Sequence, residues 1–414
     1  MSNKFQFVPG RIQFDEVIIK KKDNETNITD LIVEVNTETS ILSTTIEADF
    51  MVLDAKNVLS NLPIEAGDEI SFTVTYADGP FKMTFVLVHI TEIQDLQSQR
   101  TYNLKCCSRL QYNSMFRNIS RSYFGATSDI AFQIYKENTT EKFGIWEASV
   151  GGQSLIVPNW SPVKTLSWLA NRSTAAYDDT RFYFYQDSFG RYNFTPIEKF
   201  RELYRSKTPM KYTYRKNNQM KSTNGESIPN SAALANSILE IEFHDSFEFN
   251  FAARGGKLGG IRFQTDINTK TMNITTYDYW RDFKRESRLN DFPTWSVNKE
   301  AVTGLLQYDN VLSNTHPKIA LNKVNDRSNL KQTSLDESQT ITIVVKGNQT
   351  VDLGMVVDIE IPSPEPKTDN MRDQFDRRWS GKYYVVSKRD MYTKELKQTA
   401  LTLTKESLTD LEIR

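Results

Sequence analysis

The chain has 414 residues and a mass of 47.8 kDa, enough for about two to three domains of ordinary size. Its 51 lysines and arginines balance 52 aspartates and glutamates, and the net charge of −1 excludes the basic field typical of non-specific nucleic-acid binders. Hydrophobic residues make up 38% of the chain and 48 residues are aromatic, which excludes wholesale disorder. Glycine and proline together number only 30 of the 414 residues, a smaller share than the roughly 12% of an average protein. This scarcity predicts long uninterrupted elements.

Cysteine and histidine are both rare, which removes several kinds of site. The two cysteines are the neighbours Cys106 and Cys107, so neither a disulfide framework nor a structural zinc site is expected, and a reducing compartment fits. The first residues lack the basic and apolar regions of a signal peptide, and no stretch approaches the ~20 apolar residues of a membrane helix. We therefore expect synthesis in the cytoplasm and no membrane insertion.

Runs that alternate apolar and polar residues fill the first hundred positions and predict half-buried antiparallel strands. Six or so such strands with no helix between them make a barrel or a sandwich. The runs cover residues 12–14, 17–19, 31–35, 46–53, 69–76, 81–93 and 101–107.

After Leu110 the period of the apolar residues changes to that of helices. Ser128 is the predicted N-cap of one helix, and Ser161 with Pro162 predicts the start of a second. An aromatic hairpin follows, with strands at 182–185 and 192–194. Helices and a hairpin together predict an α+β unit.

The remainder of the chain predicts a second strand-rich region with an interruption. A polar stretch over 215–236 reads as a linker, and residues 301–312 predict the clearest helix of an insertion. Strands are expected on both sides of that insertion, over residues 238–243, 247–251, 261–263, 272–275, 340–345, 355–361, 382–386 and 399–403.

A weak internal repeat links the two strand-rich regions. Residues 63–72 resemble residues 349–358, because both place a glycine directly before a strand. A long apolar strand and then another strand ending in serine follow each copy. The pattern fits a duplicated barrel, and it also fits the general likeness of one β-meander to another.

The motifs that could carry chemistry are weak. The glycine cluster at 254–260 lacks the spacing of a phosphate-binding loop, and His244, Asp245 and Ser246 are neighbours that a strand would point to opposite faces. The aromatic run at 182–185 could stack on bases, but no positive charge surrounds it. We therefore assign no catalytic, cofactor-binding or metal-binding residue.

Two further basic groups have ordinary structural interpretations. Lys20, Lys21 and Lys22 precede Asp23 and predict a solvated turn between strands. The Arg377–Arg378–Trp379 run could bind an acidic partner, although a capped loop end is the commoner arrangement.

The helix-hairpin unit carries a resemblance to a known family. The sequences Pro-Asn-Trp-Ser-Pro at 158–162, Leu-Ser-Trp-Leu-Ala-Asn-Arg at 166–172 and Arg-Phe-Tyr-Phe-Tyr-Gln-Asp at 181–187 resemble the baseplate central hub protein of contractile-tailed bacteriophages. They are also similar to the hub portion of type VI secretion spike proteins. The stretch 379–387 and the glycines at 347 and 354 resemble the second barrel of that family.

The resemblance implies a fold and a function. The implied fold is α+β and strand-rich, with two similar tube-type antiparallel β-barrels, a helix-hairpin domain between them, and a helical insertion splitting the second barrel. Three chains would form a ring that adapts the sixfold tail tube to the threefold spike and lines the conduit for DNA. The implied location is the virion tail baseplate, and the implied role is structural, not enzymatic.

The implied partners are two further copies of the chain, the tail spike protein, and the tail tube or tube-initiator protein, with the tape measure protein and the baseplate wedge as further candidates. DNA would pass through without specific binding, and no cofactor is implied. A cell-wall hydrolase and a glycan- or receptor-binding tail protein remain as alternatives, the latter using aromatics such as Trp280 and Trp295.

The expected organisation divides the chain into five parts: a first barrel, the helix-hairpin domain with its linker, the first part of a second barrel, a helical or irregular insertion, and the second part of that barrel with the C-terminus. Their predicted ranges are 1–112, 113–235, 236–280, 281–337 and 338–414.

Overall fold

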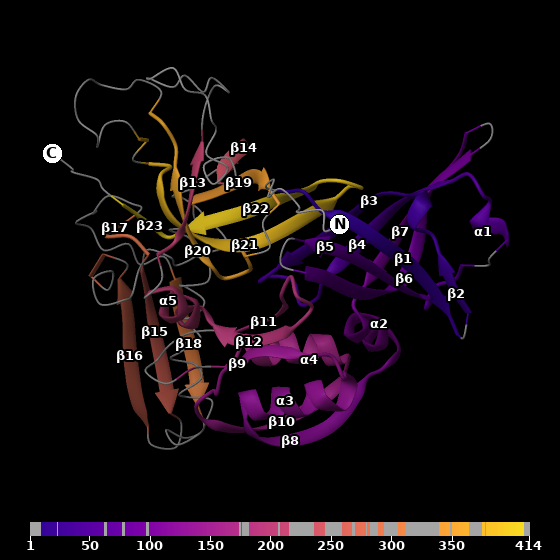
Figure 1. Ribbon diagram of the computed structural model, residues 1–414. Coiled ribbons are helices and arrows are strands. Elements are labelled where there is room, and N and C mark those ends of the chain that lie inside the picture. Colours follow the sequence, from indigo (N-terminus) through magenta and orange to yellow (C-terminus); the bar gives the residue numbers. More distant parts are fainter. Residues whose placement is uncertain are drawn as a thin grey trace.

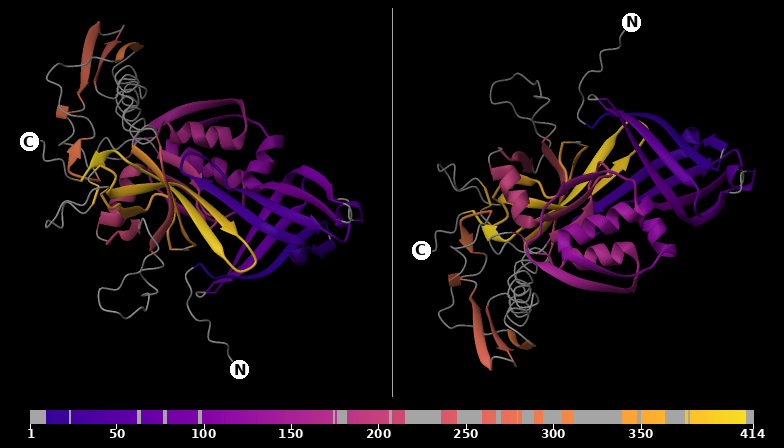
Figure 2. Two further views of the ribbon diagram at one scale, coloured as in Figure 1. Left: turned by 90° about the horizontal axis from the view of Figure 1, so that it is seen from above. Right: turned by 90° about the horizontal axis from the view of Figure 1, so that it is seen from below.

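The structure, a computed structural model, contains two β-barrels side by side, with a helix-hairpin unit packed along both (Figures 1 and 2). Each of the three parts has its own cluster of buried hydrophobic side chains. The residues that the structure describes are 10–22, 24–61, 64–76, 79–96, 99–173, 175, 182–205, 208–214, 236–244, 259–266, 270–278, 280–281, 289–293, 305–311, 339–347, 350–363, 375–376 and 378–409.

Six strands make the first barrel, in the spatial order β1-β5-β6-β7-β4-β3, and β2 lies outside β1. The predicted alternation sets their orientation: along β5, Ile70, Phe72 and Val74 are fully buried and the residues between them are partly exposed. Helix η1 (Thr29–Leu31) and the short α1 (Val58–Asn61) lie in the connections. The strands are β1 (Gln13–Lys21), β2 (Asn24–Asn27), β3 (Ile32–Ser40), β4 (Glu47–Asp54), β5 (Glu69–Tyr76), β6 (Gly79–Leu96) and β7 (Gln99–Cys107).

The helix-hairpin unit follows, as the sequence predicts. Ser161 caps α4, its Oγ accepting from the backbone N–H of Lys164 at 3.4 Å, and Pro162 is the first helical residue. The prediction that Ser128 caps a helix is wrong, because α3 begins one residue earlier and Ser128 Oγ accepts instead from the Ser149 N–H. The elements are α2 (Arg109–Phe116), β8 (Ile119–Ala126), α3 (Thr127–Asn138), β9 (Phe143–Trp146), β10 (Gly152–Trp160), α4 (Pro162–Ala170), β11 (Phe182–Gln186), β12 (Tyr192–Pro196) and α5 (Ile197–Arg205).

The second barrel is a closed ring of six strands. Its order is β13-β20-β21-β22-β19-β14, and β14 returns to pair with β13. Strand β13 runs parallel to both of its neighbours, and every other pair is antiparallel. The strands are β13 (Met210–Tyr214), β14 (Ser237–Phe243), β19 (Gln339–Lys346), β20 (Val356–Glu360), β21 (Gly381–Tyr392) and β22 (Lys397–Lys405).

Five further strands lie outside the barrels. Strand β15 (Gly259–Asp266) pairs with β16 (Thr271–Asp278) and, in parallel, with β18 (Leu305–Val311). Strands β17 (Phe292–Pro293) and β23 (Ser407–Leu408) form a separate pair. In Figure 1 the three-stranded sheet stands apart from the barrels, beside α5.

Several sequence predictions need correction in this region. The helix expected over 301–312 is wrong, because Leu305–Val311 is a strand that extends the β15–β16 sheet. Strands at 261–263 and 272–275 exist, but they belong to this separate sheet and not to the second barrel. Conversely, β13 joins the second barrel although it lies in the range expected for the helix-hairpin domain. The strand expected at 247–251 falls outside the described residues.

The two barrels repeat one topology. Strands β1, β3, β4, β5, β6 and β7 correspond in chain order to β13, β14, β19, β20, β21 and β22, and the spatial order of the two sets is the same. Five corresponding strands also run in corresponding directions; β1 is the exception, being antiparallel to β5 where β13 is parallel to β20. The strand-rich fold with two similar barrels is therefore confirmed.

The repeat extends to single hydrogen bonds. Gly67 and Gly354, the glycines of the sequence repeat, both have positive φ, at 102° and 75°. The Gly67 N–H donates to the Leu87 carbonyl, and the Gly354 N–H donates to the Val385 carbonyl, each at 2.8 Å. A register shift follows at Leu87/His89 in β6 and at Val385/Ser387 in β21. Such matching bulges are unexpected of unrelated meanders, so the two barrels are copies of one plan.

Candidate functional site: the joint between the barrels and two free strand edges

A single strand joins the two barrels. The first half of β21 pairs with β20 inside the second barrel, and its second half, from Ser387 to Tyr392, pairs antiparallel with β3 of the first barrel. The bulge at Val385/Ser387 separates the halves and bends the strand. Tyr392 is fully buried in the core of the first barrel, 5.3 Å from Phe72 between ring centroids. The barrels therefore form one continuous sheet, and β21 of the second barrel contributes a side chain to the core of the first (Figure 2).

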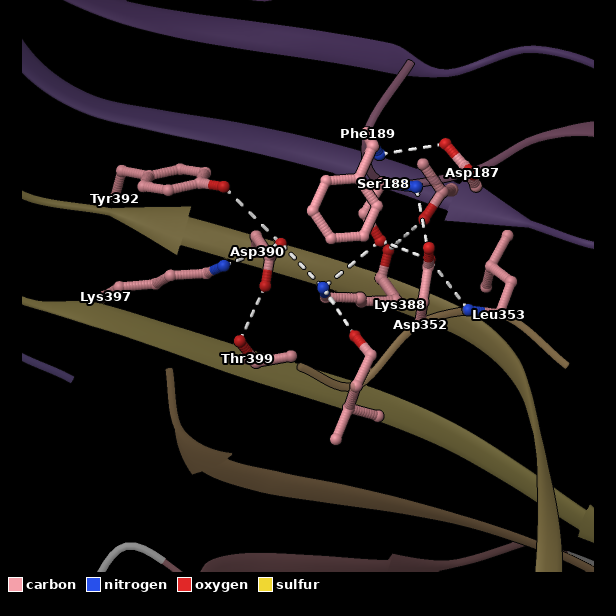
Figure 3. A network of polar contacts seen from close by, with 12 residues as sticks. Asp187, Ser188, Phe189, Asp352, Leu353, Lys388, Asp390, Tyr392, Lys397 and Thr399 are labelled. Atoms are coloured by element: carbon pink, nitrogen blue, oxygen red, sulfur yellow. Dashed lines mark hydrogen bonds and ion pairs between the residues drawn. The ribbon is translucent and has the colours of Figure 1, made fainter. Parts of the chain in front are cut away.

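A buried carboxylate forms ion pairs with two lysines at this joint (Figure 3). Asp390 Oδ2 lies 3.0 Å from the Nζ of Lys397 and 3.4 Å from the Nζ of Lys388, and all three side chains are almost completely buried. Thr399 donates a hydrogen bond to Asp390 Oδ1 at 2.6 Å, and the Tyr392 hydroxyl lies 3.5 Å from Oδ2. Buried charges persist only when they are paired in this way.

The pKa directions follow from burial and from the pairing. Burial opposes ionisation of Asp390, but the ammonium groups of Lys388 and Lys397 outweigh it and hold the pKa of Asp390 below its usual value. Burial lowers the pKa of Lys397 to about 8, although the neighbouring Asp390 carboxylate acts in the opposite direction. Asp390 is thus ionised at neutral pH, and it holds its partner lysines in place.

The turn between β11 and β12 inserts into the same network. Ser188 donates from its hydroxyl to Asp352 Oδ1 at 2.6 Å and accepts from Lys388 Nζ at 3.1 Å. On the other side, the ring of Phe189 packs 6.1 Å from the ring of Phe81 in the first barrel. We call residues 187–190 the turn clamp, because they contact both barrels at once.

The clamp itself is rigidly built. Asp187 Oδ1 accepts from the backbone N–H groups of Phe189 and Arg191, and Arg191 pairs with Asp187 Oδ2 at 2.8 Å. Burial and the nearby Asp352 charge raise the pKa of Asp187, while Arg191 acts against them. Just before the turn, the Gln186 side chain accepts from the Ile46 N–H of the first barrel. The helix-hairpin unit therefore holds the two barrels in one orientation.

Among the strand edges that have no partner strand in the part of the chain that the structure describes, one lies in each barrel. One is the outer edge of β14 from Leu239 to Phe243, beyond its short contact with β13. The other is the outer edge of β6 from His89 onward, where β7 pairs on the opposite side only. Ile93 and Phe243 are large apolar residues on these edges, and they are 54% and 45% exposed. Unpaired edges carrying apolar side chains are typical sites of strand addition.

The residues that the sequence analysis considered for chemistry are dispersed. His244 Nε2 lies 2.7 Å from Thr342 Oγ1 at the edge of the second barrel, and the next two residues of that motif lie outside the described residues. Both cysteines are buried, and burial raises the pKa of Cys106 and raises that of Cys107 to about 11, so their thiols stay protonated. Most of the glycine cluster also lies outside the described residues.

The aromatic run and the arginine-tryptophan run have structural roles. All the residues of β11 are buried, so the aromatic run offers no surface on which a base could stack. Asp376 Oδ1 accepts from the backbone N–H groups of Arg378 and Trp379, and the Arg378 guanidinium lies over the Trp379 ring at 5.8 Å. This is the capped loop end that the sequence analysis named as the commoner arrangement.

The described residues contain no cluster of histidine, cysteine and carboxylate groups that could hold a metal ion, and no described helix is long and apolar enough to cross a membrane. An open hollow of about 450 Å³ lies beside α2 and α4. Its lining offers hydroxyl groups and one ammonium but no carboxylate–imidazole pair; the lining residues are Thr44, Gln111, Ser114, Met115, Ser161, Val163, Lys164 and Ser167.

Sequence reasoning missed the buried ion pairs at the joint. The strand expected over 382–386 stops short of Lys388 and Asp390, because charged residues are usually exposed. The available signal was their spacing, since residues two apart on a strand share a face, here with Tyr392. That spacing cannot reveal burial, because the covering strand β3 is about 350 positions away in the sequence.

The fold was compared with known proteins. No family model and no curated protein matches the sequence. A tail protein from Neisseria meningitidis MC58 has a similar structure, with a TM-score of 0.58 over 95% of this chain and 97% of that one at 13% identity. The chain has the fold of a tail protein. The 43 kDa tail protein of prophage MuSo2 from Shewanella oneidensis also matches, with a TM-score of 0.54 over 95% of this chain and 98% of that one at 11% identity.

A third match is the prophage tail protein gp18 from Listeria monocytogenes EGD-e, at 10% identity and a TM-score of 0.48 over 95% of this chain and 96% of that one. For the proteins from Neisseria meningitidis and Shewanella oneidensis the likeness runs nearly end to end, and at such low identities it shows the fold. The predicted resemblance to tail proteins is confirmed at the level of the fold.

Proposed function

We propose that the chain is the structural hub of a contractile-tail baseplate. The observation that carries the proposal is the pair of barrels with one topology, joined edge to edge in a chain whose fold is that of tail proteins. A duplicated barrel is a structural device, because each chain then contributes two equivalent segments to a larger wall.

Three copies of the chain would present six barrels. Such a ring is sixfold toward a tail tube and threefold toward a spike, which resolves the mismatch between the two partners. The proposed partners are accordingly the spike protein on one side and the tube or tube-initiator protein on the other, with the tape measure protein and the baseplate wedge as further candidates. The proposed location is the tail baseplate of the virion, after synthesis in the host cytoplasm.

The interior of the ring would be a conduit for DNA. A chain with a net charge of −1 presents no net positive field to phosphates, so a polyanion could pass without being held. The proposed role is structural, without catalysis.

The test is the mass of the chain in solution together with the symmetry of its assemblies in electron micrographs, alone and mixed with the candidate spike and tube proteins. We expect threefold rings with six similar densities. A chain that stays monomeric in every mixture would contradict the proposal.

The two alternatives have their own tests. A cell-wall hydrolase would degrade peptidoglycan, so intact cell-wall material after incubation with the folded chain would remove that alternative. A glycan- or receptor-binding protein would bind to a glycan array. Of its two expected aromatics, Trp280 is partly exposed and Trp295 lies outside the described residues.

A further inference from the structure

The free edge of β14 corresponds to the edge of β3 that carries the joint. Strand β3 has a register shift at Ile32/Glu34 and β14 has one at Ile238/Glu240, at the same place in the two barrels. Beyond the shift, β3 pairs with β21 of the other barrel, whereas the matching segment of β14 has no strand beside it among the described residues. The second barrel therefore carries an unused copy of the joint's acceptor edge.

The free edge of β6 corresponds in the same way to the half of β21 that crosses between the barrels. Strand β6 pairs with β5 up to Val86, and β21 pairs with β20 up to Tyr384, which is the same register position. After the shared bulge, β21 continues from Ser387 along β3, whereas β6 continues from His89 beside β7 alone in the described structure. The first barrel therefore carries an unused copy of the donor edge.

We infer that the free edge of β6 in one copy of the chain pairs antiparallel with the free edge of β14 in a second copy, in the register of the internal β21–β3 ladder. The inference deepens the proposed hub function and rests on it, because it specifies which edges close the ring. In Figure 1, β14 and the last part of β6 lie toward opposite ends of the two-barrel body, so one chain cannot join its own edges.

The internal ladder fixes the expected register. Arg389 lies opposite Glu38 and Met391 lies opposite Asn36. In the matching strands, Thr91 of β6 corresponds to Arg389, and His244, at the end of β14, corresponds to Glu38, so Thr91 is expected opposite His244. In the same way Gln94 corresponds to Met391 and Glu242 to Asn36, so Gln94 is expected opposite Glu242.

Strand β6 has one extra residue between these two positions, since Thr91 and Gln94 lie opposite Asn103 and Thr101 of β7. The bulge at Glu92 and Ile93 consequently faces Phe243 of the other copy.

The side chains at this predicted contact are complementary. Ile93 and Phe243 are both about half exposed in the single chain, and the contact would remove both from water. Cross-strand pairs of an aromatic with a β-branched residue are among the stabilising ones in antiparallel sheets. Phe243 is also oriented by the Trp379 ring, whose centroid lies 4.5 Å away.

The polarity of the contact determines the kind of assembly. Each chain has one donor edge and one acceptor edge, so the contact is head-to-tail. Repeated contacts of this kind give a closed ring when the rotation between neighbouring copies closes, and internal and intermolecular joints then alternate around it.

Cysteine cross-linking tests the register. The variant Gln94→Cys/Glu242→Cys replaces two exposed residues, and directly opposed positions of antiparallel strands lie within disulfide range. The positive control is Asn36→Cys/Met391→Cys, the internal pair of the same register, which should link within one chain. The negative control is Gln94→Cys/Leu239→Cys, which moves one thiol three residues along β14. The native cysteines are buried and serve as background.

The full chain at high concentration is oxidised and run on a non-reducing gel, and the same sample is imaged. We expect the 94/242 variant to shift from monomer to linked multiples while the 94/239 variant stays at background. Rings without the 94/242 link would overturn the edge assignment and leave the hub proposal standing. Monomers in every mixture would overturn both.

A second variant removes the dependence on cross-linking. A lysine at an edge disfavours strand addition, so Ile93→Lys should abolish self-association without lowering the unfolding midpoint. The matched control is Ile156→Lys in β10. The Ile156 side chain is 75% exposed, and its replacement should leave self-association unchanged. Rings formed by Ile93→Lys at wild-type protein concentration would overturn the inference.

Discussion

The two barrels share a plan and differ in how their matching segments are used. The second half of β21 is covered by β3 and carries buried charges, whereas the matching end of β6 is exposed over its last five residues. The residues differ accordingly: Lys388 and Asp390 in β21 correspond to Ile90 and to the Glu92–Ile93 bulge in β6. A permanently covered edge has specific ion pairs, whereas the open edge has exposed apolar and polar side chains.

The first strands of the two barrels, β1 and β13, run in opposite directions relative to the other strands, and the length of the connection after each explains this. In the first barrel only residues 22–31 separate β1 from β3, a connection suited to antiparallel strands. In the second barrel residues 215–236 separate β13 from β14, a longer connection that allows parallel strands to be neighbours. The difference teaches that the five following strands define the repeated unit, while the first strand adapts to the chain that leads into it.

The largest expected effect comes from the joint. Asp390→Ala would leave two buried lysines without their carboxylate, so we expect a loss of about 3–5 kcal/mol in the free energy of unfolding, measured by denaturant titration. The matched change in the first barrel is Glu92→Ala, on the exposed edge. We expect it to leave the midpoint nearly unchanged, and equal losses for the two variants would contradict the comparison.

The paired glycines should respond unequally to alanine. At Gly354 a Cβ would lie 2.5 Å from the buried Phe200 ring, in addition to the cost of positive φ, so Gly354→Ala should lose about 2–4 kcal/mol. At Gly67 the Cβ would meet the Tyr112 hydroxyl, the far end of a side chain that can move, so Gly67→Ala should lose about 1–2 kcal/mol. Thermal unfolding of the two variants checks this order.

The turn clamp should contribute a smaller amount on each side. Ser188→Ala removes hydrogen bonds to Asp352 and from Lys388, and we expect a loss of about 1–2 kcal/mol. Phe189→Ala removes the ring contact with Phe81 of the first barrel, and we expect about 1 kcal/mol. An additive double variant would show that the clamp holds the barrels independently, and strong coupling would show that it acts as one unit.

A pH dependence of stability is expected from the buried lysine of the joint, Lys397. Burial lowers the pKa of Lys397 to about 8, below the ordinary value of 10.5 that the unfolded chain retains. Between these values the unfolded state binds more protons, so the free energy of unfolding should rise as the pH increases from about 8 to about 10. Lys397→Met should reduce that rise but not abolish it, because burial also lowers the pKa of Lys405, to about 7. Arg100, the matching residue of the first barrel, lies on the exposed hairpin, and Arg100→Met should leave the slope as it is.

Much of the fold was predictable because its signals are local. Strict alternation in residues 69–76 predicted β5 with its buried face, and Ser161 with Pro162 predicted the start of α4. The helix expected at 301–312 failed because tertiary pairing with β15 decided the conformation of a run whose apolar residues suited either state. Ser128 does not cap the helix, because its hydroxyl oxygen accepts a hydrogen bond from the backbone N–H of Ser149, 21 residues further along the chain.

The sequence by itself determined a strand-rich chain with a glycine-marked repeat, an aromatic hairpin, and no motif for metal, phosphate or nucleophilic chemistry. Only the tertiary structure decided that the repeat is two barrels of one topology, and that one long strand joins them through buried ion pairs. The physical reason is range: alternation and capping act within a few residues, whereas the pairing of β21 with β3 and the burial of Asp390 depend on residues more than 340 positions apart. For the same reason the two open edges become visible only when the covered edges they match are known.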